Sequence, residues 1–273
     1  MSDRSPSRFL TSALFSFFIF ASSLSAQSLP AALPDNSATE PQVTNPAEKP
    51  LQVPSENKDE LFSKGFARTF LKDQKTIWTS PLNIKKSDAK WIVPLAAGTG
   101  VLLLEDTKIS HTFDNKTSLQ NASFKVSDAG LYATWAVPGA FFAFGKMKGN
   151  DHMTETGEKG FQAAIYSTVV MQALKLATNR KRPYEGGNGS FLSGGDSFPS
   201  GHSMEAWALA TVIAREYPNR PLVKYGMYGF ATAVSVSRIT SQRHYASDVL
   251  VGSSIGYLIG RFVTRDVHPA VQQ

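Results

Sequence analysis

Three short segments of the sequence carry cations, hydroxyls and histidines at spacings that suit the chemistry of an anionic group. They are KLATNRKRP (residues 175–183), PSGH (199–202) and SRITSQRHYASD (237–248). Guanidinium groups match the oxygens of a phosphate, and a histidine can attack phosphorus or protonate the oxygen that leaves. Together, the three segments predict a site that binds a phosphate group and transfers it.

The predicted binding residues are permanent cations and the turn before a helix. Lys175, Arg182 and Arg238 supply three positive charges, and each guanidinium can hold two phosphate oxygens. Ser200 and Gly201 lie at the predicted start of a helix, where a hydroxyl and an amide join the positive end of the helix dipole. This set suits a tetrahedral dianion and the extra charge of a phosphoryl-transfer transition state.

Two histidines and an aspartate complete the predicted chemistry. His244 and Asp248 are one helical turn apart, so the carboxylate can hold the imidazole in the tautomer that leaves its other nitrogen free to attack. His202 can supply the proton that the leaving oxygen needs. Taken alone, each segment has an ordinary explanation: a capped helix with a surface histidine, a helix-end cation, or a surface ion pair. Only their combination points to a site.

Six uncharged runs predict the helices that position these residues. They are residues 91–104, 129–145, 161–174, 206–214, 225–237 and 249–260. Each run is bounded by charged residues and falls short of the roughly 20 apolar residues of a membrane span. Helices that are short and apolar on nearly all sides belong in the centre of a bundle. Two runs, 132–145 and 225–237, also resemble strands, but their length favours helices. We expect an all-α bundle of about six core helices.

The first part of the chain is predicted to lie outside this bundle. Residues 1–26 combine two arginines with an apolar, small-residue run, which is typical of a secretory signal peptide or an N-terminal anchor. Residues 27–58 contain six prolines and no aromatic residue, which predicts a disordered linker. The folded domain is therefore expected over residues 59–268. We expect an exported protein of the periplasm or cell envelope, either free or associated with the membrane.

The composition excludes several classes of site. The chain has no cysteine, which excludes disulfides, cysteine-bound zinc and a thiol nucleophile. Its net charge of +6 suits an anionic substrate or membrane surface, although a solvated surface would give the same charge. Basic and aromatic residues do not interleave in a nucleic-acid-binding motif, so no nucleic acid is expected as a partner. We recognise no metal-binding cluster. The oligomeric state is not predicted.

The three segments together resemble the three-part signature of the type 2 phosphatidic acid phosphatase (PAP2) and vanadium haloperoxidase superfamily. Every position that the signature specifies is present and in order: Lys175, Arg182, Pro183, residues 199–202, Ser237, Arg238, His244 and Asp248. The resemblance implies the all-α bundle of that family. It implies that five residues hold the phosphate: Lys175, Arg182, Ser200, Gly201 and Arg238. It further implies that His244 forms a phosphohistidine, that His202 acts as general acid and then base, and that Asp248 orients His244.

This resemblance implies a metal-independent phosphatase of the acid phosphatase or phosphatidate phosphatase type, with no cofactor and with vanadate as an inhibitor. The substrate would be a phosphomonoester or diphosphate, either soluble or lipid-linked. One alternative is a vanadium-dependent haloperoxidase, in which the same residues hold vanadate as a cofactor; family haloperoxidases are generally much longer chains. The other is an inactive phosphate- or lipid-binding scaffold. The presence of His202, His244 and Asp248 argues against this alternative.

The polar residues outside the signature receive ordinary interpretations. Arg180, Lys181 and Arg243 are expected to raise the local positive potential without touching the phosphate. The three histidines outside the signature are expected on the surface or in loops.

Overall fold

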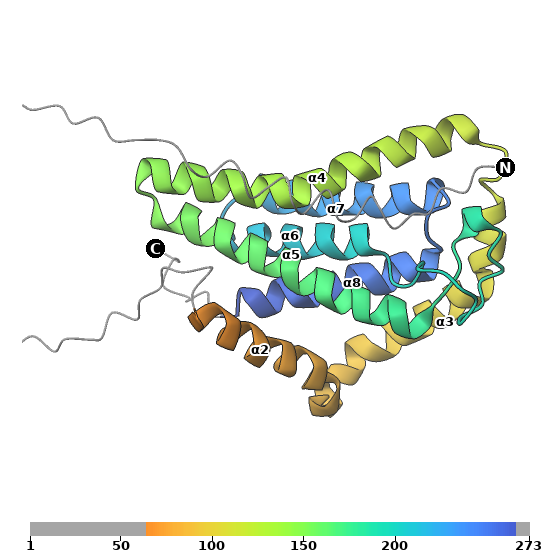
Figure 1. The fold of residues 1–273 in the computed structure, drawn as a ribbon, viewed down its shortest axis with the longest axis horizontal. Helices are drawn as coiled ribbons and strands as arrows, with labels where there is room; N and C mark the ends of the chain where they lie inside the picture. Colours follow the sequence, from red (N-terminus) through yellow and green to blue (C-terminus); the bar gives the residue numbers. More distant parts are fainter. Residues whose placement is uncertain (1–63, 266–273) are drawn as a thin grey trace, which may run out of the picture. The chain divides into compact units, whose positions relative to one another are not determined.

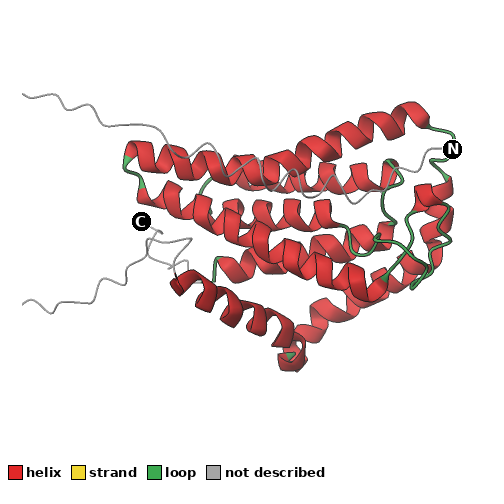
Figure 2. Ribbon diagram, in the orientation of Figure 1, coloured by secondary structure: helices red, strands yellow, loops and turns green. Residues whose placement is uncertain are grey.

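The computed structural model describes residues 64–265, and this part of the chain consists of helices joined by loops, without a strand (Figure 2). The α-helices are α2 (Lys64–Thr79), α3 (Ala89–His111), α4 (Thr117–Lys148), α5 (Asp151–Thr178), α6 (Gly201–Glu216), α7 (Pro221–Thr240) and α8 (Ala246–Val263). Short 3₁₀ turns lie at Ser80–Asn83, Lys86–Asp88 and Pro183–Glu185. The predicted all-α fold is confirmed, and the two runs that resemble strands lie within α4 and α7.

Helices α3 to α8 contain the six uncharged runs that the sequence shows. Helix α2 is absent from the sequence prediction because charged residues interrupt its apolar ones throughout. None of the described helices combines the length and hydropathy needed to cross a membrane. The predicted signal or anchor (1–26) and the predicted linker (27–58) lie outside the described residues, as do both ends of the predicted domain (59–268).

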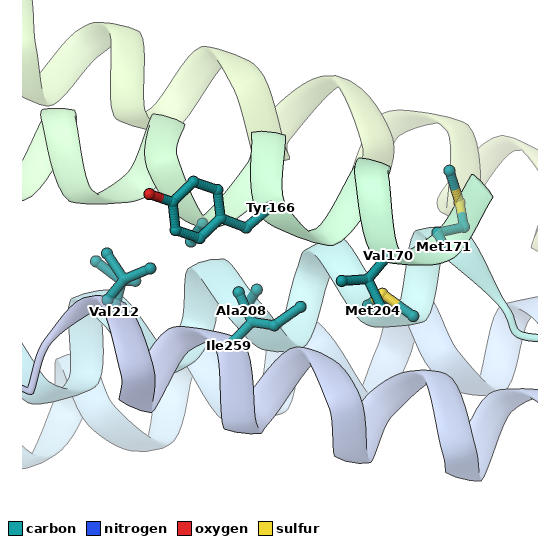
Figure 3. Packing of buried hydrophobic residues seen from close by; sticks show 9 residues of the cluster. Tyr166, Val170, Met171, Met204, Ala208, Val212 and Ile259 are labelled. Carbon is teal, nitrogen blue, oxygen red and sulfur yellow. The ribbon is translucent and has the colours of Figure 1, made fainter. Parts of the chain in front are cut away.

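Helix α6 is the central helix of the bundle and is buried along nearly its whole length. It lies against α4, α5, α7 and α8 (Figure 1). Its Met204, Ala208 and Val212 pack with Tyr166 of α5 and Ile259 of α8 in the main hydrophobic cluster (Figure 3). Because α6 has neighbours on all sides, the run 206–214 in its middle carries no charged residue, as expected for a central helix.

Helices α6 and α8 approach so closely that glycine is required at three successive turns of α8. A methyl group at Gly252 would lie 2.5 Å from the carbonyl oxygen of Ser200, and one at Gly260 would lie 2.6 Å from that of Ala208. A methyl group at Gly256, between them, would collide with the carbonyl of Met204. Their backbones are therefore in direct contact, and α8 holds the first turn of α6 in place.

The loop between α5 and α6 folds back on the end of α5. Asn179 ends α5 in the left-handed conformation (φ 44°), and the Leu192 and Ser193 amides donate to the carbonyls of residues 178 and 179 at 2.8 Å. Further along, the Ser197 amide donates to the Arg180 carbonyl at 2.7 Å. The first and last parts of this loop therefore run side by side, and residues 180–182 lie next to residues 195–197.

Candidate active site

The three predicted segments meet at one end of the bundle. They lie at the end of α5, the start of α6, the end of α7 and the start of α8. Lys175, Arg182 and Arg238 are close enough that the charge of each lowers the pKa of both His202 and His244. The Ser200 amide also donates to a carbonyl of the first turn of α8 at 3.0 Å. Residues that are distant in the sequence thus form one cluster.

His244 is buried, and its ring is fixed by a backbone carbonyl. Its Nδ1 lies 2.6 Å from the carbonyl oxygen of Ser197, and only 2% of the residue is exposed. Because a carbonyl oxygen can only accept a hydrogen bond, Nδ1 must carry the proton. The neutral ring therefore keeps its lone pair on Nε2, which is the form that a nucleophile needs.

The expected hydrogen bond between Asp248 and His244 is absent, and this corrects the sequence interpretation. Asp248 Oδ2 lies 3.8 Å from His244 Nδ1, too far for a hydrogen bond. Instead, Oδ2 accepts from Ser197 Oγ at 2.5 Å and from the Tyr245 amide at 2.9 Å. Asp248 holds Ser197, and the Ser197 carbonyl holds His244. The sequence spacing placed the pair on adjacent turns but could not show which atom lies between them.

Both histidines are neutral near neutral pH, because burial and the neighbouring cations lower the pKa of each ring. Burial, followed by the charge of Arg238, lowers the pKa of His202 to about 2. Burial and Arg238 also lower the pKa of His244 well below its usual value. His244 is ready to attack, whereas His202 must gain a proton before it can act as an acid.

Two polar atoms of the cluster are buried without a hydrogen-bond partner among the described residues. They are Nε2 of His202 and Nε of Arg238. Asp128 is the acidic group near His202, at 3.9 Å, which is beyond hydrogen-bond range. Arg238 is held through Nη1, which donates to Ser127 Oγ of α4 at 2.7 Å. Leaving a buried polar atom unsatisfied costs about 1–3 kcal/mol. A ligand with several acceptor oxygens would remove this cost.

Lys175 and Arg182 share a carboxylate that the sequence interpretation missed. Asp196 accepts from Arg182 Nε at 2.7 Å and Nη2 at 2.8 Å, and lies 3.3 Å from Lys175 Nζ. Burial would raise the pKa of Asp196, but the Arg182 hydrogen bond and the Lys175 charge lower it to about 2. Asp196 uses the side of the guanidinium that carries Nε, so the Nη1 edge stays available for another anion. Its only sequence signal was its place three residues before the turn.

Ser200 and Gly201 occupy the start of α6 as predicted, with different contacts from those expected. Ser200 is the N-cap residue, but its hydroxyl contacts Ser203 Oγ at 3.0 Å and makes no capping bond to the helix backbone. A side chain at Gly201 would collide with the sulfur of Met171. The glycine therefore has a packing reason in addition to its predicted role in binding.

The cations outside the signature differ from one another. Arg243 stacks over the rings of Phe124 and Tyr184, with its guanidinium carbon 4.5 and 4.3 Å from their centres. Arg180, expected only to raise the potential, is fully buried and pairs with two carboxylates.

Among residues 64–265, no three histidine, aspartate or glutamate side chains are grouped so as to hold a metal ion.

Comparisons with known proteins identify relatives of this region. Residues 161–272 match the model of the PAP2 superfamily. A stretch of 66 residues is 44% identical to lipid A 1-phosphatase of Porphyromonas gingivalis and covers 24% of this chain and 15% of that protein. Another of 93 residues is 32% identical to diacylglycerol pyrophosphate phosphatase 1 of Saccharomyces cerevisiae, covering 29% of this chain and 32% of that protein. The chain thus spans less than a third of either curated relative.

Two solved structures are also similar. One is Aquifex aeolicus LpxE, with a TM-score of 0.46 and 22% identity over 59% of this chain and 94% of that chain. The other is a transmembrane PAP2-type phosphatidylglycerolphosphate phosphatase from Bacillus subtilis, with a TM-score of 0.48 and 23% identity over 63% of this chain and 94% of that chain.

Proposed function

We propose that the protein is a metal-independent phosphatase, because residues 161–272 match the model of the PAP2 superfamily. It would hydrolyse phosphomonoesters or diphosphates through a phosphohistidine. The observation that carries the proposal is the pair of unsatisfied buried atoms, His202 Nε2 and Arg238 Nε, in a cluster with Lys175 and Arg182. A phosphate group has the charge and the acceptor oxygens that these groups need.

In the first half of the reaction, Nε2 of His244 attacks phosphorus, and the bond from phosphorus to the leaving oxygen breaks. His202 gives its proton to that oxygen. In the second half, water attacks the phosphohistidine, His202 takes a proton from the water, and the phosphorus–nitrogen bond breaks. Lys175, Arg182 and Arg238 neutralise the charge on the remaining phosphate oxygens in both steps.

The low pKa of His202 dictates when its proton arrives. Near neutral pH the ring is neutral while the site is empty, because burial and three cations oppose its protonation. A bound phosphate dianion offsets the cations, so the pKa of His202 rises in the complex. We therefore propose that His202 becomes an acid only after substrate has bound. Before that, the buried ring carries no charge.

We propose a lipid-linked phosphate as the substrate. Both curated relatives are named as phosphatases, one of lipid A and one of diacylglycerol pyrophosphate. Large apolar side chains are also exposed on the outer helices, including Trp91 and Leu104 of α3, Tyr132 of α4 and Leu222 of α7. Such a surface suits contact with lipid. Export to the periplasm or cell envelope rests on residues 1–26 and stays a prediction.

The direct test is phosphate release by the purified full chain. We expect release from phosphatidate and diacylglycerol pyrophosphate in detergent micelles, faster than from nitrophenyl phosphate in solution. Activity should persist in EDTA, because the cations Lys175, Arg182 and Arg238 supply the positive charge, and vanadate should inhibit it because vanadate copies the phosphoryl transition state. Activity that EDTA abolishes and magnesium restores would contradict metal independence, and a preference for soluble esters would contradict the lipid substrate.

Lysine at either predicted phosphate-binding arginine should lower the rate although it preserves the charge. Arg182→Lys and Arg238→Lys each lose a planar fork, so each should reduce kcat/KM by about 10²-fold, the usual cost of one lost transition-state donor. The matched control is Arg243→Lys, which changes a nearby cation that stacks on aromatic rings. We expect a change of a few-fold at most in the control. Equal rates in all three variants would place both arginines outside the site.

A further inference from the structure

Arg180 is the largest fully buried side chain of the described residues, and it lies between two carboxylates. Its Nη1 donates to Asp248 Oδ1 at 2.5 Å, and its Nη2 donates to Asp106 Oδ2 at 2.8 Å. All three side chains are at most 1% exposed. The guanidinium is also stacked near the rings of Phe191 and Tyr245, at 4.8 and 4.3 Å. Helix α3, the loop and α8 are thus joined at one buried cation.

This ion network reaches His244 through a single residue, Ser197. The Ser197 amide donates to the main-chain carbonyl of Arg180 at 2.7 Å, and its hydroxyl donates to Asp248 at 2.5 Å. Its carbonyl accepts from His244 Nδ1 at 2.6 Å. Arg180 therefore holds Ser197 from one side with its backbone and from the other through Asp248. Within residues 64–265, the one hydrogen bond of the His244 ring is to the carbonyl of Ser197, the residue held in this way.

The network needs Arg180 in order to exist. Burial raises the pKa of Asp248, and the Arg180 charge is the leading influence that opposes it. A buried carboxylate without a cation tends to bind a proton, and a protonated Asp248 would accept fewer hydrogen bonds from Ser197 and the Tyr245 amide. Asp106 supplies the second negative charge, accepting also from the Ser247 amide at 3.0 Å and from the Ser247 hydroxyl. Both terminal nitrogens of the Arg180 guanidinium are therefore held by a carboxylate.

We propose that Arg180, anchored by Asp106, is a positioning residue for the nucleophile. It fixes Asp248 and Ser197 so that the Ser197 carbonyl selects the Nδ1–H tautomer of His244 and aims Nε2 at the phosphate site. The statement that Nε2 points at a phosphate rests on the proposed function. The selection of the tautomer is a property of the substrate-free protein and stands apart from it.

The test combines imidazole nitrogen NMR with rapid quench. In the wild-type protein, spectra of histidine labelled with ¹⁵N should show His244 as the neutral Nδ1–H tautomer. In Arg180→Lys, a single ammonium cannot span both carboxylates, so His244 should populate both tautomers. Phosphoenzyme formation should slow by about 10²-fold, as expected for a nucleophile misplaced by about 1 Å, with a much smaller change in KM. A purely structural arginine would lower the melting temperature without changing the tautomer.

Asp106→Asn is the second variant, because replacing a fully buried arginine can prevent folding. The Asp106 carboxylate accepts from three donors through both oxygens, and an asparagine has only one acceptor oxygen. We expect a mixed tautomer and a fall of about 10-fold in phosphoenzyme formation, as for other outer contacts of a site. The matched control is Arg215→Lys at the far end of α6, where the guanidinium donates to the hydroxyl and the carbonyl of Thr264.

Several outcomes would overturn the proposal. Wild-type His244 found as the Nε2–H tautomer would do so without any variant. A folded Arg180→Lys or Asp106→Asn protein with one Nδ1–H tautomer and the wild-type rate would do so as well, as would an equal loss in Arg215→Lys. If the wild-type protein releases no phosphate from any substrate, the proposed function fails, while the tautomer comparison still decides the positioning role.

Discussion

Replacing His244 with alanine is expected to abolish the covalent phosphoenzyme with every substrate. Only the Nε2 lone pair of this ring is fixed in the attacking form, since the Ser197 carbonyl holds Nδ1. The overall rate should fall by on the order of 10⁴-fold or more, as for other nucleophiles that act as part of a unit. Quenched-flow labelling with a phosphorus-labelled ester measures the intermediate directly. Acid-labile label that persists in His244→Ala would move the role of nucleophile to another residue.

His202→Ala is the companion variant and should behave differently. Removing a general acid costs about 10²–10⁴-fold when the leaving oxygen needs a proton. Nitrophenolate leaves without one, so a nitrophenyl ester should be spared more than an alkyl phosphate. The phosphoenzyme should still form from the activated ester and should accumulate, because His202 is also the base of the second half. Equal losses with both leaving groups would contradict the acid role.

Gly256→Ala should cause a large loss of stability. The added methyl would collide with the Met204 carbonyl of α6, which is backbone and cannot rotate away. Separating two packed helices should lower the free energy of unfolding by at least about 3 kcal/mol, the upper part of the usual range for overpacking. For a domain of this size the melting temperature should fall by roughly 10 °C. Thermal unfolding measures both quantities.

The control for this change is Gly226→Ala on the exposed side of α7. A methyl group there has no neighbour within 4 Å, so only the helix preference of alanine should act. We expect a gain of about 0.5–1 kcal/mol. Opposite signs for the same substitution would show that contact between α6 and α8, and not the intrinsic preference of glycine, sets the effect. A neutral Gly256→Ala would mean that the two helices have room to separate.

The sequence predicted the helices and the meeting of the three segments because both depend on simple patterns. The middle of a central helix such as α6 faces neighbours on all sides, so its run of uncharged residues is visible without any structure. The cations and histidines of the signature are spaced to fall at helix ends, and the bundle brings those ends together. By contrast, α2 packs only one side, and the charges on its other side hide it from a search for uncharged runs.

The supporting contacts could not be predicted because they depend on individual atoms. Asp196 and Arg180 are ordinary loop residues in the sequence, and only the folding back of that loop on α5 places each beside its partners. The Ser197 carbonyl is backbone and carries no sequence signal at all. Asp248 was assigned to His244 from a spacing of one helical turn, yet His244 lies before the helix begins, so helical spacing did not apply.

The carboxylate of Asp196 has a consequence for the release of product. The three cations predicted to bind phosphate carry +3, and Asp196, bonded to two of them, brings this to +2 (3 − 1 = 2). A bound phosphate dianion would therefore bring the net charge of these groups to zero. Under the proposed function, the same cations without this carboxylate would attract inorganic phosphate more strongly, because one more positive charge would face it. We therefore expect Asp196 to weaken the hold on inorganic phosphate and to make the release of product easier.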